Sequence, residues 1–120
     1  MQLELKRIYE PSADTDGVRV LVDRLWPRGL SKDEVHVDAW LKEIAPSPDL
    51  RRWFNHDPAK WAEFQKRYRS ELENNPAVDE LRKLLPSHGR LTLLYGAKEH
   101  EHNHALVLKD FMAQHKGGGA

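Results

Sequence analysis

The sequence predicts an α/β domain with a mostly parallel sheet and flanking helices. Residues 3–9 alternate polar and apolar side chains, whereas 18–22 and 91–95 are apolar and bounded by turn residues, so all three read as strands. A long stretch of helical signals separates the second strand from the third, and an amphipathic segment follows the third. Because parallel strands need such a crossover, parallel pairing is expected, with helices covering the sheet.

The second strand is expected to stop at Pro27 and Gly29, because neither residue suits a ladder position. Ser31 and Glu34 have the spacing of a capping box, which predicts one helical turn there. Residues 35–46 fit a helix or extended chain, and the sequence leaves that choice open.

Three helix starts are marked by a capping side chain followed by proline: Ser47-Pro48, Asp57-Pro58 and Asn75-Pro76. Behind the second start, apolar residues from Trp61 to Leu72 recur at spacings of three and four, which is typical of one face of a helix. Gly89 is expected to end the third helix. Asn103 is expected to cap a final helix before the C-terminus.

Composition limits the classes of protein to consider. At 120 residues we expect a single domain over 1–116, with a flexible GGGA tail at 117–120. Its 19 basic and 19 acidic residues cancel, so net charge does not favour nucleic acid or membranes, although it leaves room for a local basic patch. There is no cysteine for disulfide or thiolate chemistry. Lacking a signal sequence or a run long enough to span a membrane, the chain is expected to be cytoplasmic.

Three stretches follow the predicted strands, at residues 9–10, 23–29 and 96–104. The carboxyl ends of parallel strands lie at one edge of a sheet, and ligands bind beyond that edge. We therefore expect these stretches to share one rim, where any chemistry should take place.

The stretch DRLWPRG, residues 23–29, offers groups suited to an anionic ligand. Arg24 and Arg28 carry planar guanidinium groups that match a phosphate or carboxylate, and Trp26 could stack on a base. In a structural alternative, Asp23 pairs with Arg24 and Trp26 packs in the core. Both readings of Asp23, Arg24, Trp26 and Arg28 stay open at this point.

The stretch 96–104 supplies a candidate acid or base. If Asn103 is the N-cap, His104 is the first helical residue and its ring lies near free amide groups that attract anions. The same field disfavours a second positive charge, so His104 should stay neutral at pH 7 and be able to donate or accept a proton. Lys98 is expected to add positive charge nearby. Because Asn103 already supplies the cap, we expect His104→Asn to leave folding nearly intact.

The alternate histidines of the segment 100–104 also raise the question of a metal site. They would share one face only if the backbone were extended throughout, and a helix start at Asn103 breaks that face. Glu99 or Glu101 could complete a ligand set, but the spacing does not require it. We expect no metal and no stoichiometric zinc, and we interpret the segment as a polar loop that leads into a capped helix.

The middle of the chain combines basic residues with aromatic ones. This pattern can indicate nucleic-acid binding, but it is more typical of amphipathic helices whose aromatic side chains point inward. We therefore interpret these basic residues as a solvated surface: Arg51, Arg52, His56, Lys60, Lys66, Arg67 and Arg69.

Three blocks resemble the YeaO-like branch of domain-of-unknown-function family 488 (DUF488). They are VDRLWPRG, DAWLKEIAPSPDLRRWFNHDPAKWAEFQKRYRSEL and LTLLYGAKEHEHNHALVL, in that order and at close spacing, within a match from about Ile8 to Phe111. The resemblance implies a small Rossmann-like three-layer α/β domain with a mostly parallel sheet and flanking helices. The family has no established activity, so the resemblance implies neither a substrate nor a cofactor.

The wider superfamily implies which positions to compare. Similar proteins carry an Asp-Val-Arg type motif at a strand end, which resembles Val22-Asp23-Arg24 here. Their final helix opens with Cys-His-Arg, where this chain has Asn103, His104 and Ala105, and their strand-end cysteine falls at Tyr95. The acid, the first arginine and the histidine carry over, whereas both cysteines and the second arginine do not. The missing cysteines argue against a thiol mechanism.

Three functions remain open from the sequence. The first is a small enzyme acting on a phosphorylated or nucleotide-like ligand, with Arg24, Arg28 and Lys98 binding the anion and His104 transferring a proton. The second is a non-catalytic module that binds a nucleotide or nucleic acid at the same rim. The third is a protein-interaction domain that uses an aromatic anchor of the middle segment. A concave basic rim would favour the first two, and a flat apolar rim the third. The oligomeric state is not determined by the sequence.

Overall fold

A computed structural model describes residues 2–99 and 101–114 as a parallel sheet with helices. The strands are β1 (Gln2–Arg7), β2 (Val18–Leu21), β3 (Ala39–Trp40) and β4 (Arg90–Tyr95). The helices are α1 (Pro48–Phe54), α2 (Trp61–Glu73), α3 (Pro76–Leu84) and α4 (His104–Gln114). Short 3-10 turns at Asp14–Asp16, Lys42–Ile44 and Pro58–Lys60 precede β2, α1 and α2. His100 and the tail at 117–120, both considered in the sequence analysis, lie outside the described residues.

The sheet has the strand order β1-β4-β2-β3, and every neighbouring pair is parallel. Leu93 of the central strand β4 is in register with Leu5 of β1 and with Val20 of β2. The predicted parallel α/β fold is therefore confirmed. Since the strands are parallel, the segments that follow β1, β2 and β4 emerge at one edge of the sheet.

The predicted helix starts are confirmed by their hydrogen bonds. The side chains of Ser47, Asp57 and Asn75 each accept a backbone N–H from the turn that follows, with proline in the first turn. Asn103 Oδ1 accepts the N–H of Leu106 at 3.2 Å, which caps α4 as expected. These caps satisfy amide groups that would otherwise lack partners at the helix starts.

Two local expectations are corrected. Ser31 and Glu34 form a hydrogen-bonded turn without a helix behind it: the Glu34 carboxylate accepts the Ser31 N–H at 3.0 Å, as in a capping box. The chain then runs into β3 and the turn Lys42–Ile44, so residues 35–46 contain no α-helix. The third helix ends at Leu84 rather than at Gly89, because Pro86 restricts the preceding Leu85 to extended backbone.

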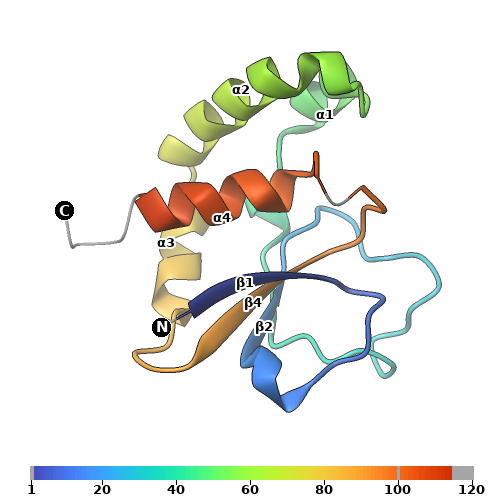
Figure 1. Ribbon diagram of the computed structural model, residues 1–120, viewed down its shortest axis with the longest axis vertical. Coiled ribbons are helices and arrows are strands. Elements are labelled where there is room, and N and C mark those ends of the chain that lie inside the picture. The colour runs from blue at the N-terminus through green and yellow to red at the C-terminus, as the bar shows by residue number, and fades with distance from the viewer. Residues whose placement is uncertain (1, 100, 115–120) are drawn as a thin grey trace.

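One face of the sheet is covered by helices. Residues of all four helices share a single apolar core with β2 and β4, including Val20, Leu93, Tyr68 and Leu108. α4 lies against β1 and β4, and α2 packs on α4 from the far side, which Figure 1 shows as successive layers. The start of α4 is thereby held next to the carboxyl ends of the strands.

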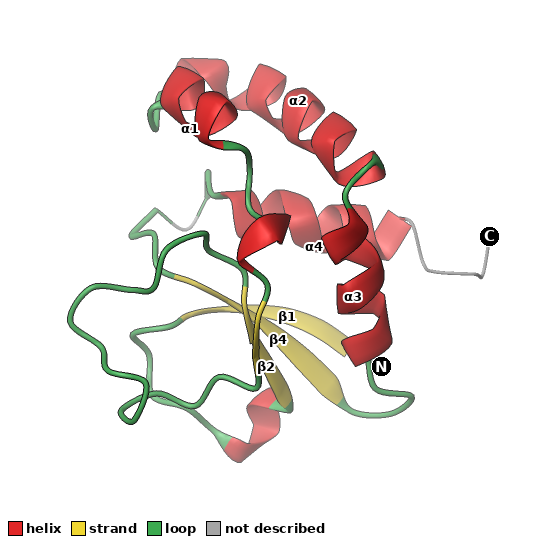
Figure 2. Cartoon of the chain, turned by 180° about the vertical axis from the view of Figure 1, so that it is seen from behind, coloured by secondary structure: helices red, strands yellow, loops and turns green. Residues whose placement is uncertain are grey.

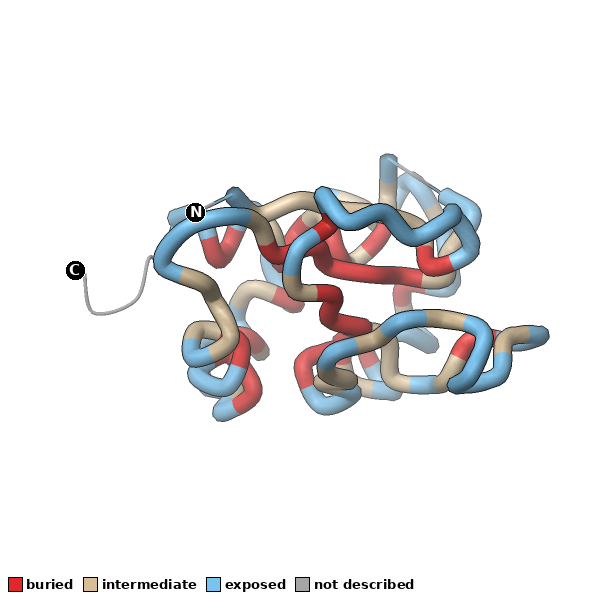
Figure 3. The backbone as a smooth tube through the Cα atoms, turned by 90° about the horizontal axis from the view of Figure 1, so that it is seen from below, coloured by how far each residue is buried: buried red, intermediate tan, exposed pale blue. Residues whose placement is uncertain are grey.

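The opposite face is covered by a long loop. Ile8, Leu21 and Leu94 form a second core with residues of the segment 22–40, chiefly Trp26 and Trp40, whose rings meet edge to face at 5.4 Å. This loop projects at the right of Figure 1 and at the left of Figure 2. Figure 3 shows the buried residues gathered inside, with exposed residues along the outer loops. The third layer of the domain is thus loop rather than helix.

Across the described part of the chain, none of the helices combines the length and the apolar character needed to cross a membrane.

Candidate functional site

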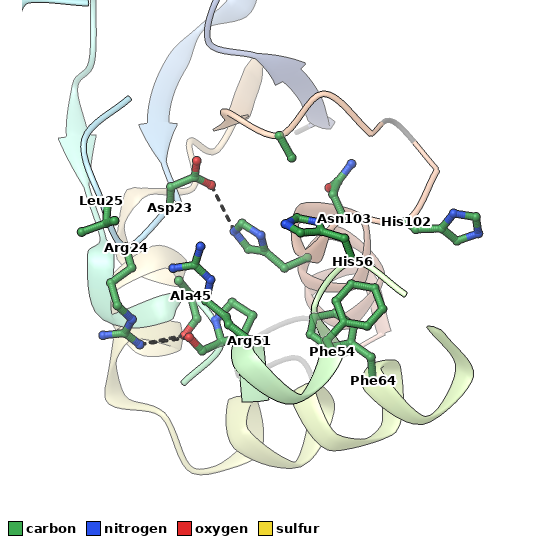
Figure 4. Close-up of a pocket in the computed structure, with 13 residues that line it drawn as sticks. Asp23, Arg24, Leu25, Ala45, Arg51, Phe54, His56, Phe64, His102 and Asn103 are labelled. Carbon is green, nitrogen blue, oxygen red and sulfur yellow. Dashed lines mark hydrogen bonds and ion pairs between the residues drawn. The ribbon is translucent and has the colours of Figure 1, made fainter. Parts of the chain in front are cut away.

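A pocket of about 240 Å3 opens at the carboxyl end of β2, between the strand ends and the helical layer. Its polar lining comes from segments far apart in the chain: Asp23, Arg24, Arg51, His56, His102, Asn103 and His104. The apolar lining is Leu25, Ala45, Pro46, Phe54, Phe64 and Ala97. Figure 4 shows these side chains around the pocket. The predicted rim therefore contains a concave pocket.

The imidazole of His104 joins the start of α4 to the end of β2. Nε2 lies 2.9 Å from the carbonyl oxygen of Val22 and 3.3 Å from Oδ1 of Asp23. In Figure 4 a dashed line from Asp23 marks the second of these contacts. A backbone carbonyl can only accept, so Nε2 carries the proton and donates it to Val22. Nδ1 is then the nitrogen with the lone pair, and it has no hydrogen-bond partner within residues 2–99 and 101–114.

Asp23 is itself fixed from two sides. Its Oδ2 accepts the N–H of Gly96 at 2.8 Å, and its carbonyl oxygen accepts Nε1 of Trp40 at 2.7 Å. A Cβ at position 96 would stand 3.0 Å from that Oδ2, so glycine permits the close approach of the two chains. The segments after β2 and β4 and the start of α4 thus form one hydrogen-bonded unit.

The pKa of His104 is lowered from its ordinary value. The largest cause is burial of the ring, which disfavours the charged form, and the nearby Arg51 acts in the same direction. Asp23 and the Val22 carbonyl favour the charged form and oppose that shift. The expectation of a neutral His104 is confirmed in direction, but the main cause is burial rather than the field of the helix.

Asn103 makes hydrogen bonds within the protein through both the oxygen and the nitrogen of its amide. Oδ1 caps α4, while Nδ2 donates to the carbonyl oxygen of Glu99 at 2.8 Å and closes the loop before the helix. The residue is buried at the pocket wall. Its role visible in the structure is to fix the position of His104.

Arg24 lines the pocket, but its guanidinium group turns towards the chain before α1. Nη2 lies 3.3 and 3.2 Å from the carbonyl oxygens of Ala45 and Pro46, and Nη1 lies 3.5 Å from the exposed carboxylate of Glu43. In Figure 4 the dashed contacts of Arg24 lie away from Asp23. The sequence predicts that Arg24 and His104 lie at one rim. The structure places both on one pocket, with Asp23 rather than Arg24 in contact with the imidazole.

Arg51 was assigned from the sequence to a solvated surface, and it is exposed, but it also lines the pocket. Its guanidinium group has no hydrogen bond or ion pair within the described chain, and it is close enough to His104 to affect the pKa of that ring. Arg51 stands three positions before Phe54, on the flank of the inward face of α1, and that spacing is the available signal. His56 was likewise assigned to the surface from the sequence, and it also lines the pocket.

Three predicted site residues lie elsewhere. Trp26 belongs to the core on the other face of the sheet, where its Nε1 donates to the Leu30 carbonyl at 2.6 Å. Arg28 is exposed, and its carbonyl oxygen accepts the Tyr9 hydroxyl at 2.8 Å. Lys98 is exposed in the loop after β4, outside the pocket lining. The structure does not bring these residues to Arg51 and His104.

A possible metal-ligand group lies beside the pocket. Ligand atoms of Glu99, Glu101 and His102 all fall within 4.8 Å of one another, on the surface of the loop before α4. Exposed acidic groups commonly cluster without binding an ion, so this grouping alone does not establish a site. The expectation of no stoichiometric zinc stays a prediction.

The chain is similar to proteins of known sequence over nearly its full length. The family described as the inactive DUF488-N3 subclade, DUF488-N3i, matches residues 2–117. The uncharacterised protein YeaO of Escherichia coli is 42% identical over 112 residues, which cover 93% of this chain and 97% of the relative. The uncharacterised protein Rv3073c of Mycobacterium tuberculosis is 41% identical over 113 residues, covering 92% of this chain and 93% of the relative.

No solved structure matches the chain. The resemblance found in the sequence blocks is confirmed by the family match and by the identity to YeaO. The chain therefore belongs to the YeaO-like DUF488 family, in the subclade described as inactive.

Proposed function

We propose that the pocket binds a small ligand with an anionic group, such as a phosphate, and that it does so without turnover. The observation that carries this proposal is the guanidinium group of Arg51, which lines the pocket and has no partner in the described chain. Arg51 is exposed to solvent at the mouth of the pocket. A guanidinium group without a counter-charge is suited to bind a phosphate or carboxylate.

The charges around Arg51 support an anion. Asn103 and His104, the cap and first residue of α4, line the same pocket, so the positive end of this helix is directed at it. Asp23 brings an opposing charge: its Oδ2 accepts a backbone N–H, whereas its buried Oδ1, 3.3 Å from His104 Nε2, has no hydrogen-bond partner in the described chain. The cationic group that the pocket offers to an anion is the guanidinium group of Arg51.

The size of the pocket limits the ligand. Typical sites for drug-sized molecules measure roughly 300–1,000 Å3, and this one measures about 240 Å3. A phosphate ester of a small sugar is in keeping with that volume, whereas a dinucleotide would extend outside it. Leu25, Phe54 and Phe64 provide apolar surface for the body of the ligand.

Two observations favour binding without turnover. The family is described as an inactive subclade. In addition, the Nε2 proton of His104 is donated to Val22, so that nitrogen is used in holding the site together. A concave pocket with a mixed polar and apolar lining also favours a small ligand over the flat apolar surface expected of a protein-interaction domain. The zero net charge does not favour nucleic acid.

A second candidate is general-base catalysis by His104. The contact with Asp23 orients the imidazole, and the lone pair of Nδ1 is not used within the described residues. A base oriented in this way could accept a proton from a bound ligand. This candidate would be favoured if the unmodified protein turned over a bound phosphate ester, and if His104→Asn lost that turnover while still binding the ester.

The proposal is tested by calorimetric titration of the protein with inorganic phosphate, ribose 5-phosphate and AMP. We expect the sugar phosphate to bind and Arg51→Ala to weaken binding at least tenfold, because a charge-assisted contact to the ligand is lost. Arg52→Ala is the matched control: Arg52 lies on the same helix and pairs with Asp49 on the surface, so its loss changes net charge equally. Equal weakening by both variants, or no binding by the unmodified protein, would contradict the proposal.

A further inference from the structure

The turn after α1 contains an unusual backbone conformation. Asn55 and His56 both have positive φ angles, 44° and 54°, and among the described residues they are the non-glycine positions with this property. L-amino acids with a side chain adopt the left-handed region rarely, because Cβ approaches the backbone too closely. Two such residues in succession call for a physical reason.

Asn55 has a local reason. It ends α1 in the left-handed conformation, and its N–H donates to the Arg51 carbonyl at 2.9 Å, closing the helix. Asparagine is among the residues that tolerate this position best. Its side chain is exposed and does not line the pocket.

His56 completes the same turn, which is closed by the N–H of Asp57 donating to the Phe54 carbonyl at 3.0 Å. That bond accounts for the backbone conformation but not for a histidine side chain at this position. Its imidazole makes no hydrogen bond or ion pair in the described chain. The centroid of its ring lies 6.3 Å from that of Phe54, and the two ring planes are tilted relative to each other. Glycine would adopt this backbone without strain. What the histidine adds is a ring at the pocket wall, in the turn that follows the helix carrying Arg51. Strained residues of this kind are found at ligand-binding sites, where the side chain is needed in one place.

We infer that His56 is a second ligand-binding residue, which acts with Arg51 on the same anionic group; this inference rests on the proposed function. Arg51 approaches from the last turns of α1 and His56 from the turn that ends it, so the two donors reach the ligand from one short segment. A phosphate monoester offers three terminal oxygens to these donors and to the start of α4, whereas a carboxylate offers two. The ligand class that fits the arrangement best is therefore a small phosphate monoester.

The test compares His56→Gly with Asn55→Gly, because both remove a side chain from a left-handed position. Each is expected to keep or raise the melting temperature, since glycine relieves the backbone. Binding of ribose 5-phosphate, measured by calorimetry, is expected to fall about tenfold in His56→Gly and to stay within twofold of the unmodified protein in Asn55→Gly. Acetate is expected to bind more weakly than inorganic phosphate.

The possible results distinguish the role of His56 from the proposed binding of an anion by Arg51. Wild-type affinity in His56→Gly, alongside weakened binding in Arg51→Ala, would overturn the role of His56 and leave the proposed function intact. A large fall in the melting temperature of His56→Gly alone would show that the ring is structural, and would overturn the inference as well. Failure of the unmodified protein to bind either phosphate compound would overturn both.

Discussion

The imidazole of His104 and the carboxylate of Asp23 face each other across the junction of strand and helix, with Nε2 and Oδ1 3.3 Å apart. The same nitrogen donates to Val22, and the other carboxylate oxygen accepts the N–H of Gly96. Through these contacts the end of β2, the end of β4 and the start of α4 hold one another in place. His104 therefore stabilises the fold and also lines the pocket.

We therefore expect His104→Asn to lower the free energy of unfolding by about 1–3 kcal/mol, because the buried Val22 carbonyl loses its side-chain donor. This replaces the sequence-based expectation that folding would be nearly intact. The cap at Asn103 is unaffected, since its bond to Leu106 does not involve His104. Urea denaturation measures the change. A variant as stable as the unmodified protein would show that the contact to Val22 contributes little.

The stability of the protein should depend on pH through His104. Its pKa in the folded protein is lowered from the ordinary value of 6.5, mainly by burial, so the folded state binds its proton less readily than the unfolded state does. The stabilisation is complete above pH 6.5 and is lost progressively as the pH falls below that value. Denaturation series from pH 8 to 5 should show this loss in the unmodified protein.

A matched pair of variants tests that assignment. His104→Gln should flatten the dependence between pH 7 and 5, because the titrating group is gone. His88→Gln, at an exposed position before β4, should retain it. An unchanged profile in His104→Gln would assign the acid sensitivity to other groups.

Trp26→Ala should destabilise the protein without affecting the pocket. Trp26 packs against Trp40 on the loop-covered face, so its removal leaves a gap and costs about 2–4 kcal/mol. Binding of ribose 5-phosphate to the folded variant should be unchanged, since Trp26 does not line the pocket around Arg51. A selective loss of binding at full stability would instead support the stacking role considered from the sequence.

Glu43→Gln should strengthen binding of a phosphate compound. The Glu43 carboxylate lies 3.5 Å from Nη1 of Arg24, whose buried Nε has no partner in the described chain, so Glu43 competes with a ligand for this arginine. Exposed ion pairs contribute up to about 1 kcal/mol, which sets an upper limit of roughly fivefold in affinity. Glu80→Gln is the control. Glu80 and Glu43 both line a second groove next to the pocket, and the replacement of either residue removes one negative charge. An equal gain in affinity from both variants would show that the change in net charge, rather than the release of Arg24 from Glu43, strengthens binding.

The sequence by itself determined the secondary structure that positions the site. Alternating and β-branched runs predicted three of the strands, and a capping side chain before proline predicted the starts at Ser47, Asp57 and Asn75, because these signals act over a few residues. The parallel order followed from the long crossover between β2 and β4. The choice of Arg24 and His104 followed from the rule that strand ends meet at one rim.

Only the tertiary structure decided which side chains meet at that rim. Arg51 and His56 are exposed, as their interpretation as surface residues expected, but only the packing of α1 places them at the pocket. The direction of the Arg24 guanidinium group towards Ala45 depends on a segment that no local pattern brings near it. The contact of Trp26 with Trp40 also depends on tertiary packing, because a loop rather than a helix connects the two residues. Local patterns specify hydrogen bonds within a turn, whereas these contacts depend on how separate segments pack, and that packing minimises the free energy of the whole chain at once.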